Sequence, residues 1–158
     1  EFARLGVSPL EFGFWLSFTG LGYFVGNILN KHYAAVFGIE KLIVIGCLLS
    51  LISYLSILFM HLNVFSNPLY IALPIIVFGL GNGFTVANCI IGAVSSTGGN
   101  SGTATGVAGA MQMSSGGIVG TIVISLGGDE SFLVCLIFVN LLCAIACLLS
   151  FYNLKNKT

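Results

Sequence analysis

A long stretch without any charged side chain is the feature that most limits the fold of this chain. Residues 42–128 contain no Asp, Glu, Lys or Arg. Across the whole chain 6% of residues are charged and 57% are hydrophobic, whereas about a quarter of the residues in a soluble domain are charged. Such a chain cannot cover a water-facing surface with polar side chains. We therefore expect an integral membrane protein.

Charge and cysteine content argue against several classes of function. Five basic and five acidic residues cancel, so neither a basic face for nucleic acid nor an acidic tail for a charged partner is expected. The cysteines lie in apolar runs without a CxxC pair or a neighbouring His, and we expect them to act as small hydrophobic residues. They are Cys47, Cys89, Cys135, Cys143 and Cys147. We therefore predict neither a metal site nor a cofactor.

Five apolar segments are long enough to cross a bilayer as helices, for which about 20 residues are needed. The segments cover residues 12–31, 42–60, 69–94, 102–126 and 132–152. Glycine, proline and polar residues separate them, and Pro74 is expected to kink the third segment. We predict an all-α fold with five transmembrane helices, in a single membrane domain over residues 1–158.

The basic residues indicate how the chain lies across the membrane, because cytoplasmic loops collect Lys and Arg. Lys31 and Lys41 lie between the first two segments, and Lys155 and Lys157 follow the fifth, whereas the opposite side carries only Arg4. We therefore expect a multi-pass protein with its N-terminus outside and its C-terminus in the cytoplasm. The chain begins without an initiator Met or signal-peptide features, so we also expect it to be processed or part of a longer protein.

Three segments carry glycine and polar residues on one helical face, whereas segments 42–60 and 132–152 are apolar nearly all round and are expected to face lipid. Small residues that recur every three or four positions lie on one side of a helix. They allow membrane helices to approach closely, so we predict that these glycines pack helices together. The predicted packing glycines are Gly22, Gly26, Gly79, Gly83, Gly102, Gly106, Gly109, Gly116 and Gly120.

Amide side chains on the same three segments are costly in hydrocarbon and usually face the interior of a bundle or a water-filled cavity. They are Asn27, Asn30, Asn82, Asn88 and Gln112. Two interpretations stay open, namely hydrogen bonds between helices and the lining of a cavity. Because glycines and amides occur together on three segments, we expect those segments to surround a shared polar interior.

Three stretches of the sequence carry a family resemblance. They are LGVSPLEFGFWLSFTGLGYFVGN (5–27), FGLGNGFTVANCIIGAV (78–94) and GTATGVAGAMQMSSGGIVG (102–120). They resemble the eighth, tenth and eleventh helices of major facilitator transporters of the bicyclomycin-resistance (Bcr/CflA) drug:proton antiporter subfamily. The resemblance implies the C-terminal portion of a twelve-helix fold, helices eight to twelve. The first, third and fourth segments would then line a central cavity, and the second and fifth would lie at the periphery.

The same resemblance implies a function. The chain is expected to form part of a secondary active multidrug efflux transporter in the bacterial inner membrane, and to be inactive alone. Its expected partners are the lipid bilayer, a small hydrophobic or amphipathic drug-like substrate, and the N-terminal half of such a transporter. Substrate contacts are expected at Tyr23, Asn27, Asn88 and Gln112.

The same residues bear on proton coupling and on two other possible functions. No carboxylate or histidine lies deep in the five segments, so protons are expected to pass through residues outside this chain. A second interpretation is a non-transporting helical membrane subunit that packs against a partner through its glycines. An intramembrane enzyme is disfavoured, because no His, carboxylate or Ser/His pair clusters at depth, and no catalytic residue is predicted.

Overall fold

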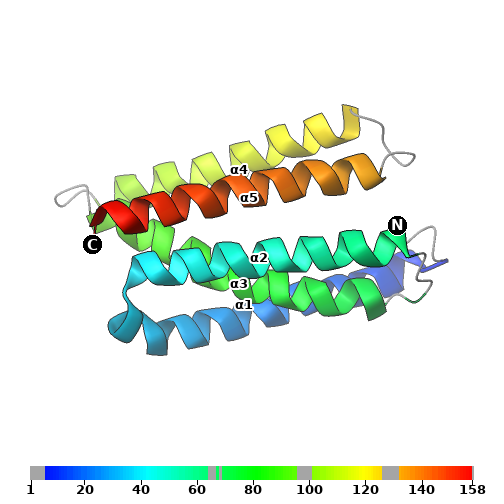
Figure 1. The fold of residues 1–158 in the computed structure, drawn as a ribbon, viewed down its shortest axis with the longest axis horizontal. Coiled ribbons are helices and arrows are strands. Elements are labelled where there is room, and N and C mark those ends of the chain that lie inside the picture. The colour runs from blue at the N-terminus through cyan, green and yellow to red at the C-terminus, as the bar shows by residue number, and fades with distance from the viewer. Residues whose placement is uncertain (1–5, 64–66, 68, 96–100, 126–131, 158) are drawn as a thin grey trace.

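Five α-helices run up and down in the described part of this computed structural model (Figure 1). The structure describes residues 6–63, 67, 69–95, 101–125 and 132–157. The helices are α1 (Pro9–Phe37), α2 (Ile39–Leu62), α3 (Leu69–Ser95), α4 (Ser101–Ser125) and α5 (Phe132–Lys157). No strand occurs within these ranges, so the prediction of an all-α fold is confirmed.

Four of the helices in the described ranges are long and apolar enough to cross a membrane, namely α1, α2, α3 and α5. This property supports a multi-pass membrane protein. α4 has a similar length, and glycine, serine and threonine residues interrupt its apolar residues. The fourth predicted segment therefore forms a helix of spanning length.

Local signals at both ends make α1 longer than the apolar segment 12–31. Glu11 N donates a hydrogen bond to Ser8 Oγ at 3.3 Å, and Ser8 N donates one to Glu11 Oε2 at 2.9 Å. This reciprocal capping box fixes the start of the helix, and Pro9 occupies the first turn, where its missing N–H costs nothing. α1 ends at Gly38, whose φ of 80° favours glycine.

α3 lies at the centre of the bundle, with α1 and α2 packed against it, while α5 packs on α2 and α4 contacts α3. α2 thus contacts both α3 and α5, and the expectation that segment 42–60 lies at the periphery of a twelve-helix fold stays a prediction. Gly46 and Ser53 lie two turns apart on the buried side of α2. A Cβ on Gly46 would lie 2.5 Å from Gly81 O, so only glycine lets the two helices approach this closely.

α5 lies antiparallel to α2 and contacts it along its length. The rings of His61 and Phe132 meet edge to face, with their centroids 5.0 Å apart, at one end. Farther along, Asn140 Nδ2 donates a hydrogen bond to Tyr54 O at 3.4 Å. The Asn140 amide, in the apolar part of α5, is therefore directed at a neighbouring helix rather than at lipid.

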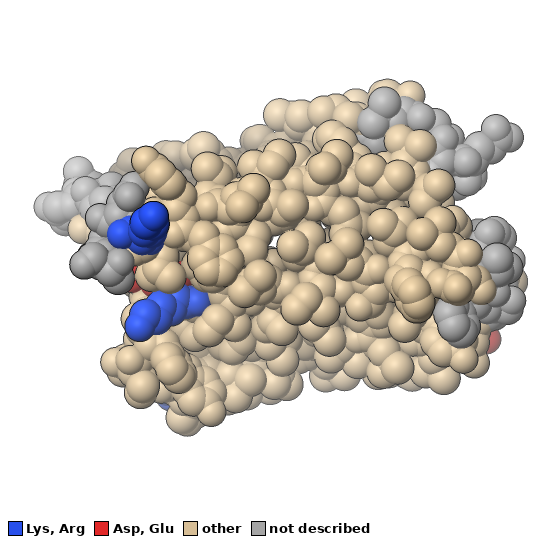
Figure 2. Space-filling model, in the orientation of Figure 1, with Lys and Arg blue, Asp and Glu red and all other residues tan. Residues whose placement is uncertain are grey.

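The described lysines lie at one end of the bundle (Figure 2). Lys31 is in the C-terminal third of α1, Lys41 in the first turn of α2 and Lys155 near the end of α5. These places meet because successive helices run in opposite directions (Figure 1). This is the end predicted to face the cytoplasm, and Arg4 lies outside the described residues. The orientation in a cell stays a prediction.

Candidate functional site

The stretch GLGNG in α3 places alternate glycines on two sides of the helix. Gly79 and Gly83 face α1, whereas Gly81 faces α2. A Cβ on Gly83 would lie 2.8 Å from Tyr23 O, and a Cβ on Gly81 would lie 2.6 Å from Gly46 O. Any side chain at these positions would collide with the backbone of a neighbouring helix. The glycines therefore allow α3 to contact two helices at backbone distance.

α1 meets α3 through a matching pair of glycines. Gly22 and Gly26 are buried, and a Cβ on Gly26 would lie 2.5 Å from Leu80 O. Together with Gly79 and Gly83 they form two G-x-x-x-G motifs in contact, an arrangement that brings membrane helices close together. These four predicted packing glycines therefore lie at a contact between helices.

Two amides extend the contact between α1 and α3 beyond the glycines. Asn88 Nδ2 donates hydrogen bonds to Asn30 Oδ1 at 2.6 Å and to Phe84 O at 2.7 Å. Asn88 is fully buried, and its Oδ1 atom has no partner among the described residues. The pair thus forms an interhelical hydrogen bond.

Tyr23 and Asn27 lie on α1 beside the contact with α3. The Tyr23 side chain is exposed and that of Asn27 is half-buried. Asn27 Nδ2 donates a hydrogen bond to Tyr23 O at 2.9 Å, so part of its amide is satisfied within its own helix. A substrate-binding role for these two residues stays a prediction.

α4 turns its glycines away from the other described helices. Ala104 is its one buried residue among those whose burial is described, and residues two positions away lie on nearly the opposite side of a helix. No described atom lies within 4 Å of the Cβ positions of Gly102, Gly106, Gly109, Gly116 and Gly120. The packing predicted for these glycines is not made among the described residues, and it stays a prediction about a partner.

Gln112 lies exposed in the middle of α4. Its amide has no hydrogen-bond partner among the described residues, whereas nearby hydroxyls bond to their own helix. Thr105 Oγ1 donates to Ser101 O at 2.9 Å, and Ser115 Oγ donates to Gln112 O at 3.0 Å. The surface called here the open face of α4 consists of Gly106, Gly109, Gln112, Met113 and Gly116.

The polar sides of α1, α3 and α4 do not enclose a shared hollow within the described chain, contrary to the expectation. The glycine contact and the hydrogen bond between Asn30 and Asn88 close the space between α1 and α3. The open face of α4 meets neither helix. The physical reason is that glycines spaced for a helix face allow direct backbone contact, which leaves no room for water.

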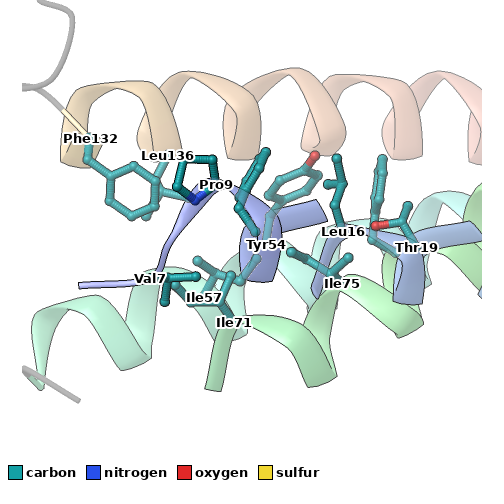
Figure 3. Close-up of a pocket in the computed structure, with 12 residues that line it drawn as sticks. Val7, Pro9, Leu16, Thr19, Tyr54, Ile57, Ile71, Ile75, Phe132 and Leu136 are labelled. Atoms are coloured by element: carbon teal, nitrogen blue, oxygen red, sulfur yellow. The ribbon is translucent and has the colours of Figure 1, made fainter. Parts of the chain in front are cut away.

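A cavity of about 660 Å³ lies instead between α1, α2, α3 and α5 (Figure 3). Its wall is mainly aliphatic and aromatic, as at Leu16, with hydroxyl groups supplied by Thr19 and Tyr54. In Figure 3 Val7 and Phe132 lie toward one end and Thr19 toward the other. Sequence reasoning did not predict this cavity, because it arises from the spacing of four helices and has no motif of its own.

A second cavity, of about 450 Å³, lies between α2, α3 and α5 near the lysine-bearing end. Glu40, Asn88 and Asn153 contribute polar groups to its wall. Asn88 thus borders this cavity, whereas Tyr23, Asn27 and Gln112 border neither of the two described cavities. The structure does not bring the four predicted substrate contacts together within the described chain.

Metal ligation and similarity to known proteins give no further indication of function. The described residues contain no group of three or more His, Cys, Asp or Glu side chains that could hold a metal ion. No family model matches the chain, and no curated protein or solved structure matches it either. The open face of α4 and the apolar cavity are therefore the features from which a function is inferred.

Proposed function

We propose that this chain forms part of a secondary active efflux transporter that exchanges a small hydrophobic or amphipathic molecule for protons. In this proposal α4 lines the transport path, and the tightly packed helices α1, α2 and α3 support it. The observation that carries the proposal is the open face of α4. It has the residue types of a helix in the interior of a membrane protein, yet no described helix covers it.

The cost of exposing polar groups to lipid supports this role for α4. An amide without a hydrogen bond in hydrocarbon costs several kcal/mol, about 1–3 kcal/mol even on scales derived from proteins. Gln112 would bear this cost if α4 faced lipid, and the glycines around it would contribute little apolar area in return. The open face is therefore expected to contact water or further protein, and a transport path supplies both.

Proton coupling is assigned to helices beyond those described. Residues 42–128 hold no charged side chain, and a proton relay in a membrane requires a group that gains and loses a proton at depth. In our proposal this chain supplies part of the wall of the transport path, and a second set of helices supplies the relay.

A non-transporting subunit is the competing function, and the glycines of the open face favour it as much as they favour a transporter. In that case the open face packs against a partner helix and stays dry. The two functions therefore differ in whether water reaches Gln112.

Cysteine labelling tests this difference in membranes that contain the complete natural protein with its own cysteines replaced. Gln112→Cys is expected to react with a membrane-impermeant maleimide, and an excess of the amphipathic cation ethidium is expected to slow the reaction. The matched control is Leu148→Cys on α5, where the side chain is 69% exposed on an apolar helix, and it is expected to stay unlabelled. An unreactive Gln112→Cys beside normal membrane insertion would reject the transport path and leave the subunit.

Transport itself is measured in energised cells. Cells with the complete protein are expected to hold less ethidium than cells with an empty vector, and a protonophore is expected to abolish the difference. Equal ethidium content in both, with the protein present in the membrane, contradicts the proposal.

A further inference from the structure

The cavity between α1, α2, α3 and α5 has the size and chemistry of a binding site for a small molecule. Its volume of about 660 Å³ falls in the range of roughly 300–1,000 Å³ that is typical of ligand pockets, which are mainly apolar with a few polar groups. Leu16, Ile75 and Phe78 represent its apolar wall. The cavity is not part of the open face of α4.

Two hydroxyl groups give this cavity its polar character. Thr19 Oγ1 is a buried atom without a hydrogen-bond partner among the described residues, which is costly for a hydroxyl. Tyr54 also lines the cavity, and no described residue accepts from or donates to its hydroxyl. A ligand that offers one hydrogen-bonding group would satisfy a hydroxyl that the protein itself leaves unpaired.

Position and charge limit the ligand further. Thr19 lies seven residues after Phe12, the first residue of the predicted apolar segment, so it is about 10 Å along the helix from that point, within the length that spans a hydrocarbon core of about 30 Å. No Asp, Glu, Lys or Arg is among the described residues that line the cavity. A charged ligand would lack a partner at this depth and would remain desolvated.

The cavity is partly open between α1 and α5, two helices that are long and apolar enough to cross a membrane. α1 and α5 both contribute to its wall, but they do not pack along each other. Phe12 and Leu16 of α1 and Phe132 of α5 line this side of the cavity, and Phe12 and Leu16 are exposed. A molecule that enters here needs to be soluble in hydrocarbon.

We propose that this cavity binds an uncharged, mainly apolar molecule with a single hydroxyl or comparable group, which hydrogen-bonds to Thr19 and Tyr54. The site is independent of the transport activity proposed above, and its test requires no transport.

Photolabelling tests the proposal on the complete protein in lipid nanodiscs. The probe is a trifluoromethyl-diazirinyl benzyl alcohol, which is neutral and carries one hydroxyl, and labelled residues are located by mass spectrometry. Saturable labelling is expected on cavity residues of α1, α2 and α5, with competition by 4-(trifluoromethyl)benzyl alcohol. The corresponding diazirinyl benzoate, which is negatively charged, is expected to give no saturable labelling.

Two variants connect the labelling to the cavity. Thr19→Val keeps the shape of the side chain and is expected to raise the half-saturating concentration of the competitor about fivefold, as the loss of one ordinary hydrogen bond would. Leu16→Trp is expected to fill the space and remove saturable labelling. The matched controls are Thr105→Val, whose hydroxyl bonds within α4, and Leu21→Trp, which is on exposed α1 surface outside the cavity.

The result that would overturn the proposal is labelling spread over lipid-facing residues without saturation. Saturable labelling that is equal in the parent protein, Thr19→Val and Leu16→Trp would overturn it as well. If Leu16→Trp is not recovered in folded form, Thr19→Val alone decides the outcome. If the complete protein exports no ethidium but still shows saturable labelling of the cavity, the proposed transporter is rejected and the proposed binding site is kept.

Discussion

The amide of Asn88 donates a hydrogen bond of 2.6 Å to the amide oxygen of Asn30, and so joins α3 to α1 at a fully buried position. This bond continues the line of contact that the glycines begin. Asn88, which is one of the predicted substrate contacts, therefore has a structural role.

The first prediction concerns this pair. Asn30→Ala and Asn88→Ala are each expected to lower the free energy of unfolding by about 1 kcal/mol, because hydrogen bonds between membrane helices contribute about that much. The double variant is expected to lose less than the sum, with a coupling energy of about 0.6 kcal/mol. Unfolding titrations in mixed micelles measure all three variants. Additive effects would show that the two amides do not act as a pair.

The second prediction compares two glycines. Gly83→Ala is expected to destabilise the chain by about 1–3 kcal/mol, the usual cost of overpacking, because its Cβ would meet Tyr23 O at 2.8 Å. Gly109→Ala on α4 has no neighbour within 4 Å, so it is expected to be neutral or to stabilise the helix by up to about 1 kcal/mol. Thermal unfolding of residues 1–158 in detergent compares the two. Equal changes in the unfolding temperature of the two variants would contradict the placement of Gly83 at the contact between α1 and α3.

The third prediction concerns the bond between α2 and α3. Ser53 is 1% exposed, and its Oγ donates to Pro74 O at 2.6 Å. Ser53→Ala is expected to cost about 1 kcal/mol, the net contribution of an ordinary hydrogen bond. Ser56→Ala is the matched control, because Ser56 Oγ bonds to Ile52 O in its own helix. A smaller loss for Ser53→Ala than for Ser56→Ala in unfolding titrations would count against this contact.

The fourth prediction concerns Gln112 and rests on the proposed transport. Gln112→Ala in the complete protein is expected to change which compounds are exported while leaving the amount of protein in the membrane unchanged. The physical reason is that an exposed amide without a partner contributes to the wall of the path rather than to packing. Growth inhibition by a panel of amphipathic compounds measures the change. An unaltered resistance profile removes Gln112 from the transport path.

The fifth prediction concerns orientation. The end of the bundle with Lys31, Lys41 and Lys155 is expected to face the cytoplasm, because basic residues near membrane spans are retained there. Green fluorescent protein fused after Thr158 is expected to fluoresce, and alkaline phosphatase at the same place is expected to be inactive. The reverse pattern would show that the chain lies the other way round.

The helices of this protein could be predicted from the sequence because each depends on local information. Runs of apolar residues set their length, and Ser8, Pro9 and Gly38 fix the ends of α1. The contact between α1 and α3 also has a local signature, since Gly22 and Gly26 match Gly79 and Gly83 in spacing. The spacing predicts packing glycines, but it does not tell which two helices they join.

The position of α2 could not be predicted in the same way. Its contact surface depends on Gly46 and Ser53. The large apolar residues around these two positions hide any pattern that they could form in the sequence. A serine that bonds to its own helix and a serine that bonds to another helix look identical in a sequence. Only the register of α2 against α3 distinguishes Ser53 from Ser56.

The interlocked glycines of α3 have a mechanical consequence. Rotation of α3 about its axis would move Gly81 away from α2 and Gly83 away from α1 at the same time. Translation of α3 along its axis would bring Leu80 or Thr85 against the backbone of a neighbouring helix. The contacts of α3 with α1 and α2 thus oppose both rotation and translation of α3. A movement of α3 relative to α1 or α2 would therefore have to break these backbone contacts.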